Sequence, residues 1–113
     1  ADAHVRGLEL LDEIGVLEEI LPEIVAGKGV EQRSDYHKFD VYGHIMETVR
    51  KADPSVRLAA LLHDVAKPYC KATFGIFKDH AIYGVETTKK ILKKLRYPNK
   101  TIKEVCFLVG NHM

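Results

Sequence analysis

The sequence predicts an all-α domain. Three observations support this: apolar residues recur with helical spacing nearly throughout, turn-forming residues collect in two loops at about 26–38 and 69–78, and Pro, Asp and Gly stand where helices would begin and end. The 113 residues are enough for one domain with a single core. We therefore expect a bundle of about five to six helices over residues 1–113, with residues 1–27 as an N-terminal helical segment that packs on it.

The first part of the chain predicts short helices followed by one longer helix. Val5, Leu8 and Leu11 mark the first helix, which should stop at Gly15. Pro22 suits the start of a helix better than its interior. The further helical segments expected before residue 52 are 16–20, 22–25 and about 39–51.

The second part of the chain predicts three more helices. Asp53-Pro54 is a start signal, with Asp53 as the cap, and this fourth helix should run to Lys67, where Pro68 stops it. Residues 69–78 are then expected to form a loop, with a small hairpin around Gly75 as one alternative.

The last two helices follow that loop. Asp79 should cap a fifth helix that continues to about Arg96. The final helix should begin either at Pro98-Asn99 or at Thr101, with Glu104 completing a capping box, and should reach the end of the chain.

Composition and charge exclude several classes of protein. The hydrophobic share of 46% and the charged share of 29% are ordinary for a soluble globular protein, and the net charge of +1 gives no global attraction to nucleic acid or membranes. No apolar run approaches the roughly 20 residues that span a bilayer. Cys70 and Cys106 lack metal-type spacing, so we expect a reduced, cytoplasmic protein. The chain has no initiator Met and is expected to be part of a longer protein.

The histidines provide the candidate site. His44 lies within an apolar stripe of its helix, and His112 continues the stripe of the last helix, so both are expected to point inward. His63 and Asp64 come at the end of a helix that is otherwise apolar nearly all round, which predicts a buried helix whose C-terminal end opens into a pocket. His80 follows the expected cap at Asp79.

Each of these residues alone also fits a structural role. His44 and His112 suit hydrogen-bonded core histidines, His80 suits a surface or capping residue, and a His-Asp pair occurs by chance. Together, several imidazoles and a carboxylate on different helices predict a divalent metal, because they are ligands of Zn, Fe, Mn, Ni and Co. Burying them without a partner would be unfavourable by several kcal/mol.

The motif "LLHDVAKP", with His44 upstream and His80 and His112 downstream, resembles the core motif of the HD superfamily of metal-dependent phosphohydrolases. The stretches "GLELLDEIGVLEEILPEI", "YHKFDVYGHIMETV", "DHAIYGVE" and "LRYPNKTIKEV" with "VGNHM" further resemble the HD-containing part of bacterial tRNA nucleotidyltransferase/poly(A) polymerase family proteins. The similarity covers nearly the whole chain.

This resemblance implies an all-α HD domain that binds one or two divalent ions (Mn, Fe, Ni, Co, Zn or Mg). His44, His63 and Asp64 would be metal ligands, with Asp64 able to bridge two ions. His80 and His112 match positions that hold a second ion in some HD subfamilies. The family also supplies a last Asp ligand after the His112 position, for which Asp79 is the only nearby stand-in.

The activity implied is hydrolysis of a nucleotide or RNA phosphate, including a 2′,3′-cyclic or terminal phosphate. Lys67 would neutralise phosphate charge, Asp64 or His80 would accept or orient a proton, and His37 is a further candidate for phosphate contact. Aromatic residues of the 69–78 loop would either wall the pocket or pack on the core; they are Tyr69, Phe74 and Phe77.

Two other interpretations remain. In the first, the domain is a non-catalytic helical binding or structural module of a tRNA-modifying protein. In the second, it is a helical domain without a site. The chain has neither the Gly-Gly loop nor the paired carboxylates of a nucleotidyltransferase, so we expect no nucleotide addition by this segment. The basic run Lys89, Lys90, Lys93, Lys94 and Arg96 suits a solvated helix face or, alternatively, an RNA backbone contact.

Overall fold

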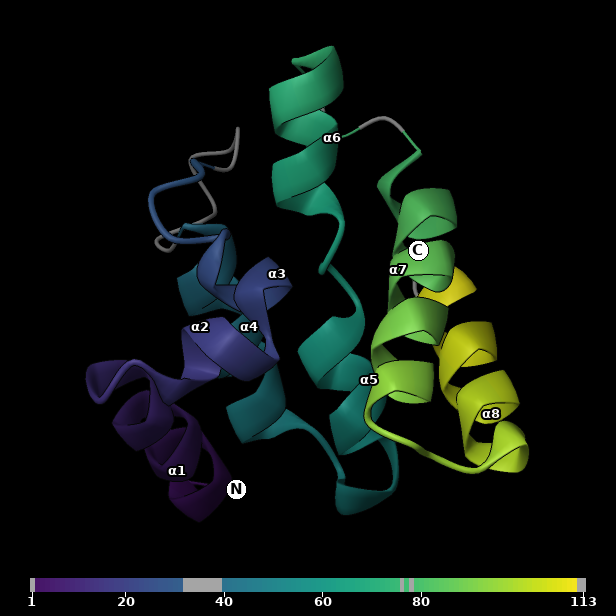
Figure 1. The fold of residues 1–113 in the computed structure, drawn as a ribbon, viewed down its shortest axis with the longest axis horizontal. Helices are drawn as coiled ribbons and strands as arrows, with labels where there is room; N and C mark the ends of the chain where they lie inside the picture. The colour runs from purple at the N-terminus through teal and green to yellow at the C-terminus, as the bar shows by residue number, and fades with distance from the viewer. Residues whose placement is uncertain (1, 32–39, 76, 78, 112–113) are drawn as a thin grey trace.

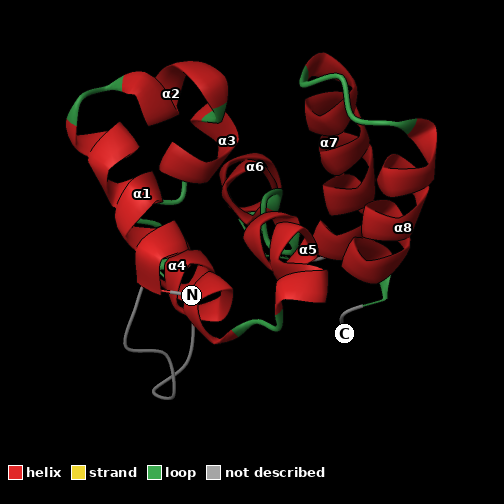
Figure 2. Ribbon diagram, turned by 90° about the horizontal axis from the view of Figure 1, so that it is seen from below, coloured by secondary structure: helices red, strands yellow, loops and turns green. Residues whose placement is uncertain are grey.

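The computed structural model describes residues 2–31, 40–75, 77 and 79–111, and these form helices and connecting turns without any strand (Figure 2). The elements are α1 (Asp2–Glu13), α2 (Val16–Ile20), α3 (Pro22–Val25), α4 (Val41–Lys51), the 3₁₀ helix η1 (Pro54–Val56), α5 (Arg57–Leu62), α6 (Lys67–Phe74), α7 (His80–Lys94) and α8 (Asn99–Gly110). This confirms the predicted all-α class. None of the described helices combines the length and the apolar character that crossing a membrane requires.

Helix α5 lies in the middle of the molecule. It packs on α4 on one side and on α8 on the other, while α1 packs on α4 and α7 packs on α8 (Figure 1). Helix α6 stands at one end, beyond α5, and contacts the start of α7. The chain therefore places two groups of helices on either side of α5, and the residues at the end of α5 lie between them.

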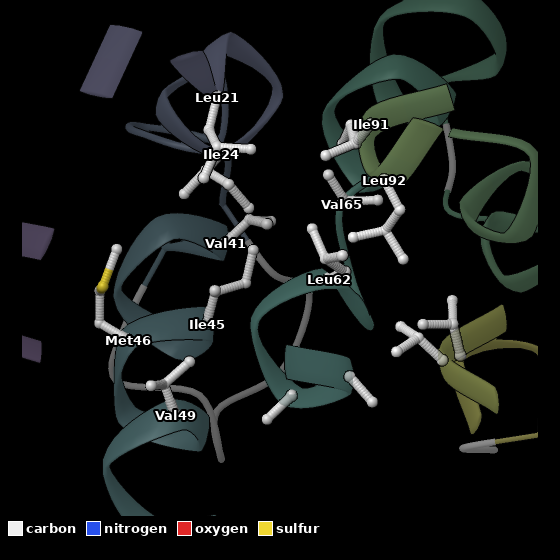
Figure 3. Close-up of a cluster of buried hydrophobic side chains, with 14 of the residues drawn as sticks. Leu21, Ile24, Val41, Ile45, Met46, Val49, Leu62, Val65, Ile91 and Leu92 are labelled. Carbon is white, nitrogen blue, oxygen red and sulfur yellow. The ribbon is translucent and has the colours of Figure 1, made fainter. Parts of the chain in front are cut away.

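The core joins the two groups through aliphatic side chains. Ile45 and Val49 of α4 face Leu62 at the end of α5, and Leu62 with Val65 lies close to Ile91 and Leu92 of α7 (Figure 3). All of these side chains are at most 5% exposed. Burying such side chains stabilises each position by about 1.5–3 kcal/mol relative to exposure, so the core fixes the end of α5 against α4 and α7.

The predictions for the N-terminal helices are confirmed. Helix α1 ends at Glu13, and Gly15 adopts a φ of 81°, which glycine reaches without the steric penalty of a Cβ atom. Leu17 of α2 and Ile24 of α3 are fully buried. The next helix begins at Val41, where Asp40 caps it by accepting a hydrogen bond from the Gly43 amide; the expected start near Phe39 lies outside the described residues.

The predicted fourth helix over 53–67 is wrong. The chain forms η1 and α5, leaves the helix after Leu62, turns over residues 63–66 and enters α6. Pro68 lies in the first turn of α6 rather than ending a helix, because the amide hydrogen that proline lacks has no intrahelical partner there. Most of the predicted loop at 69–78 is therefore helical, and Gly75, with a φ of 76°, ends α6 instead of forming a hairpin tip.

Helix α7 ends at Lys94, close to the predicted end near Arg96, whereas α8 ends at Gly110 rather than at the end of the chain. Asp79 occupies the position before α7, yet its side chain makes no capping hydrogen bond. Helix α8 begins directly after Pro98, which confirms the first alternative and excludes Thr101 as the start. The five basic residues from Lys89 to Arg96 are all exposed, in agreement with a solvated face.

Asp12 connects α1 to the rest of the N-terminal half. Its carboxylate accepts a hydrogen bond from the Tyr42 hydroxyl of α4 at 2.9 Å and pairs with Lys28 at 2.6 Å. Hydrogen bonding to Lys28 and then to Tyr42 lowers the pKa of Asp12. Burial and the contact with Asp12 raise the pKa of Tyr42, so the hydroxyl stays a donor.

We expect Asp12→Asn to reduce the free energy of unfolding by about 1 kcal/mol at pH 7. The pKa of Asp12 is lower in the folded protein than in the unfolded chain, where it is about 4. The contribution of Asp12 to the free energy of unfolding is therefore fully present above about pH 4 and is lost as the pH falls through the pKa of the folded state. The difference between variant and parent in urea unfolding should therefore shrink below about pH 4. Glu104→Gln, at an exposed carboxylate of α8, is the control; an equal difference at pH 7 and pH 2.5 would contradict this account.

Candidate metal centre

The turn between α5 and α6 holds the centre of the candidate site. It places His63 and Asp64 at the point where the chain leaves α5, and Asp64 is only 2% exposed. Asp64 Oδ2 lies 3.0 Å from His63 Nε2 and 3.3 Å from His44 Nε2 of α4. The two imidazole Nε2 atoms are 3.4 Å apart. Among the described residues, His44, His63 and Asp64 form the group whose donor atoms converge closely enough to hold a metal ion.

The hydrogen bonds of His63 show which of its nitrogens faces this group as a ligand. His63 Nδ1 lies 2.6 Å from the carbonyl oxygen of Ala60. Because a carbonyl can only accept, Nδ1 is assigned as the protonated nitrogen and donates to it. In the neutral ring Nε2 then carries a lone pair, which faces a carboxylate oxygen and a second imidazole nitrogen. Electron pairs that converge in this way need a proton or a cation between them, so the donor set fits a divalent metal.

His80 approaches the other oxygen of the same carboxylate. Its Nε2 lies 3.4 Å from Asp64 Oδ1, and its Nδ1 donates to the carbonyl oxygen of Phe77 at 3.1 Å. The side chain is 11% exposed. His80 is therefore not the simple surface or capping residue that one interpretation expected, because the start of α7 directs it at Asp64.

Lys67 completes the contacts of Asp64. Its Nζ lies 3.2 Å from Asp64 Oδ2, and the ammonium group also lies over the Phe77 ring, 5.2 Å from the ring centroid. The first turn of α6 thus places a positive charge beside the Asp64 carboxylate of the preceding turn. Because the side chain is 13% exposed, this charge lies at the edge of the site rather than in bulk solvent.

Asp64 stays ionised despite its burial. Burial by itself would raise the pKa of Asp64, but the contacts with His44, His63 and the Lys67 ammonium group outweigh it and hold this pKa well below its usual range. A buried carboxylate that remains charged near neutral pH is available as a metal ligand without first losing a proton.

The structure brings together most of the residues predicted from the sequence, but His44 and Asp79 differ from what was expected of them. His44 is only partly buried: its side chain is 30% exposed at the margin of the core and is directed at the buried Asp64. His37 and His112 lie outside the described residues. Asp79, the proposed stand-in ligand, is exposed and is not part of the convergent group.

Two contributions to the site were missed. The carbonyl groups of Ala60 and Phe77 orient His63 and His80, and no side-chain motif signals a backbone role. Lys71 lies one turn after Lys67 on α6, and its ammonium group also lies over Phe77, 5.6 Å from the centroid. The spacing of four residues would have revealed this pair, had residues 67–74 been recognised as a helix.

Comparison with known proteins identifies the family. The family model of the HD domain matches residues 35–113, a range that contains the whole convergent group. The chain belongs to the HD domain family. This confirms the resemblance drawn from "LLHDVAKP". No solved structure gives a significant match to this HD domain.

The curated relatives of this HD domain include tRNA nucleotidyltransferases. The A-adding tRNA nucleotidyltransferase of Deinococcus radiodurans is 35% identical over an alignment that covers 96% of this chain and 27% of that protein. The CC-adding enzyme of Thermus thermophilus is 33% identical, covering 95% and 27%. The multifunctional CCA protein of Neisseria meningitidis serogroup A is 40% identical, covering 80% and 24%. The chain spans about a quarter of the length of these relatives.

Proposed function

We propose that residues 1–113 form a single HD domain that binds a divalent metal ion and hydrolyses a nucleotide or RNA phosphate, as part of a cytoplasmic tRNA nucleotidyltransferase-like protein. The observation that carries the proposal is the convergence of His44 Nε2, His63 Nε2 and Asp64 Oδ2 within 3.4 Å of one another. Membership of the HD family and the names of the relatives support both the chemistry and the nucleic-acid substrate.

His44, His63 and Asp64 would hold the ion, with the Ala60 carbonyl keeping His63 in the ligating tautomer. A divalent ion bound there supplies Lewis acidity toward water and toward a phosphoryl oxygen. Its identity is one of Mn, Fe, Ni, Co, Zn or Mg. A second ion would use the other oxygen of Asp64 together with His80, and also His112 by family resemblance.

The remaining polar side chains act on the substrate. Lys67 would donate hydrogen bonds from its ammonium group to phosphate oxygens, since its Nζ lies 3.2 Å from Asp64 and so at the edge of the metal group. Without a second ion, His80 Nε2 is positioned to hold a proton beside Asp64 Oδ1, because its Nδ1 is committed to the Phe77 carbonyl. His37 remains a candidate for phosphate contact.

The test is hydrolysis of bis-p-nitrophenyl phosphate by the protein supplied with Mn²⁺, Co²⁺ or Ni²⁺. We expect turnover by the parent and a loss of about 100-fold or more in His63→Ala, because this change removes a ligand. His4→Ala, at an exposed residue of α1, is the matched control and should retain full activity. If the metal-loaded parent does not hydrolyse the ester and His63→Ala changes nothing, the domain is instead a helical binding or structural module.

A further inference from the structure

Two lysines of α6 share one aromatic ring beside the candidate site. Lys67 and Lys71 are one helical turn apart, and their ammonium groups lie 5.2 Å and 5.6 Å from the centroid of the Phe77 ring. Phe77 is half-buried and packs on the core, and its carbonyl accepts the hydrogen bond from His80. Phe77 therefore contacts both lysines through its ring and orients His80 of the candidate site through its carbonyl group.

The two positive charges differ in what they contact. Lys67 pairs with Asp64, whereas Lys71 is exposed and forms no ion pair with any of the residues that the structure describes. A cation–π contact attracts an ammonium group through the ring quadrupole and leaves its full charge in place. The Phe77 ring thus positions the charge of Lys71 without neutralising it, one turn further from the metal group than Lys67.

Aromatic rings lie exposed on the same pair of helices. Tyr69 and Phe74 of α6 are 54% and 48% exposed, and both pack against Tyr83 of α7 with ring centroids 5.5–5.6 Å apart. Exposed aromatic rings beside unpaired basic side chains are typical of surfaces that bind single-stranded nucleic acid, where bases stack on the rings and lysines contact the backbone. A small phosphate ester would use neither feature.

We infer that Lys71 binds a second phosphate group, the phosphodiester next to the one held at the metal group, so that the site takes the end of a single-stranded RNA in preference to a mononucleotide. This inference rests on the proposed function for the first phosphate. Lys71 is a binding residue and takes no part in the chemical step.

The test uses two substrates that share the reacting group: a nucleoside 2′,3′-cyclic monophosphate, and a trinucleotide that ends in the same cyclic phosphate and adds two nucleotides with their phosphodiesters. Lys71→Gln should lower kcat/KM for the trinucleotide about tenfold, as expected for the loss of one charged hydrogen bond, and leave the mononucleotide unchanged. Lys71→Arg should restore most of the loss. Lys100→Gln, at an exposed lysine of α8, is the matched control and should affect neither substrate.

A binding measurement separates this inference from the proposed hydrolysis. Fluorescence anisotropy of the metal-loaded protein with a labelled trinucleotide that ends in a hydrolysis-resistant phosphorothioate reports affinity without turnover, and Lys71→Gln should weaken binding and reduce the salt slope by about one. If the parent is inactive while this loss is seen, the second-phosphate site stands and the hydrolase proposal fails. Equal losses in Lys71→Gln and Lys100→Gln, or equal losses on both substrates, would overturn the inference.

Discussion

Replacing Asp64 with Asn is expected to abolish metal binding at the candidate centre. Asp64 is the shared partner of His44, His63, Lys67 and His80, and its carboxylate is the single negative charge in this group. An amide keeps nearly the same size but removes that charge. We expect the affinity for Mn²⁺ or Ni²⁺ to fall by about 100-fold or more, measured by calorimetric titration of the metal-free protein, and phosphodiester hydrolysis to fall with it.

Asp79→Asn is the matched control for this experiment. Its carboxylate is exposed and makes no capping hydrogen bond with α7, and it does not belong to the convergent group. It should bind metal as the parent does. Metal affinity that survives Asp64→Asn, or that falls equally in Asp79→Asn, would show that the ion is held elsewhere. A thermal unfolding curve of each variant would establish that the comparison is made between folded proteins.

Leu62→Ala is expected to have the largest effect on stability. Leu62 is 1% exposed, lies at the end of α5 and faces the core side chains of both helix groups (Figure 3). Truncating a buried leucine in a well-packed core reduces the free energy of unfolding by about 2–5 kcal/mol, against a total of about 5–15 kcal/mol for a typical domain. The urea midpoint should fall accordingly. Because His63 follows directly, we also expect weaker metal binding in the fraction that remains folded.

Leu10→Ala provides the comparison for Leu62→Ala. Leu10 lies on α1 and is 45% exposed, so its truncation should change the free energy of unfolding by no more than about 0.5 kcal/mol. A similar loss in the two variants would mean that the end of α5 is not the packed junction that the structure indicates. If Leu62→Ala lowers stability without affecting metal affinity, the position of His63 does not depend on the packing of Leu62.

The central part of the chain shows where prediction from sequence failed. The apolar spacing of residues 58–65 continues through the end of α5, so periodicity cannot reveal that the backbone leaves the helix after Leu62. Pro68 is compatible both with the end of one helix and with the first turn of another. Pro68 was interpreted as the end of a helix, so α6 with Lys67 and Lys71 was not predicted.

The sequence by itself determined the helical class, most helix boundaries and the identity of the metal-binding candidates, because apolar spacing, capping residues and the His-Asp motif are local properties of the chain. The tertiary structure alone decided how these candidates meet. The orientation of His63 and His80 depends on the carbonyls of Ala60 and Phe77, a group that every residue carries and no sequence pattern distinguishes. The placement of His44 at the core margin likewise depends on how α4 packs against α5, which only the folded chain fixes.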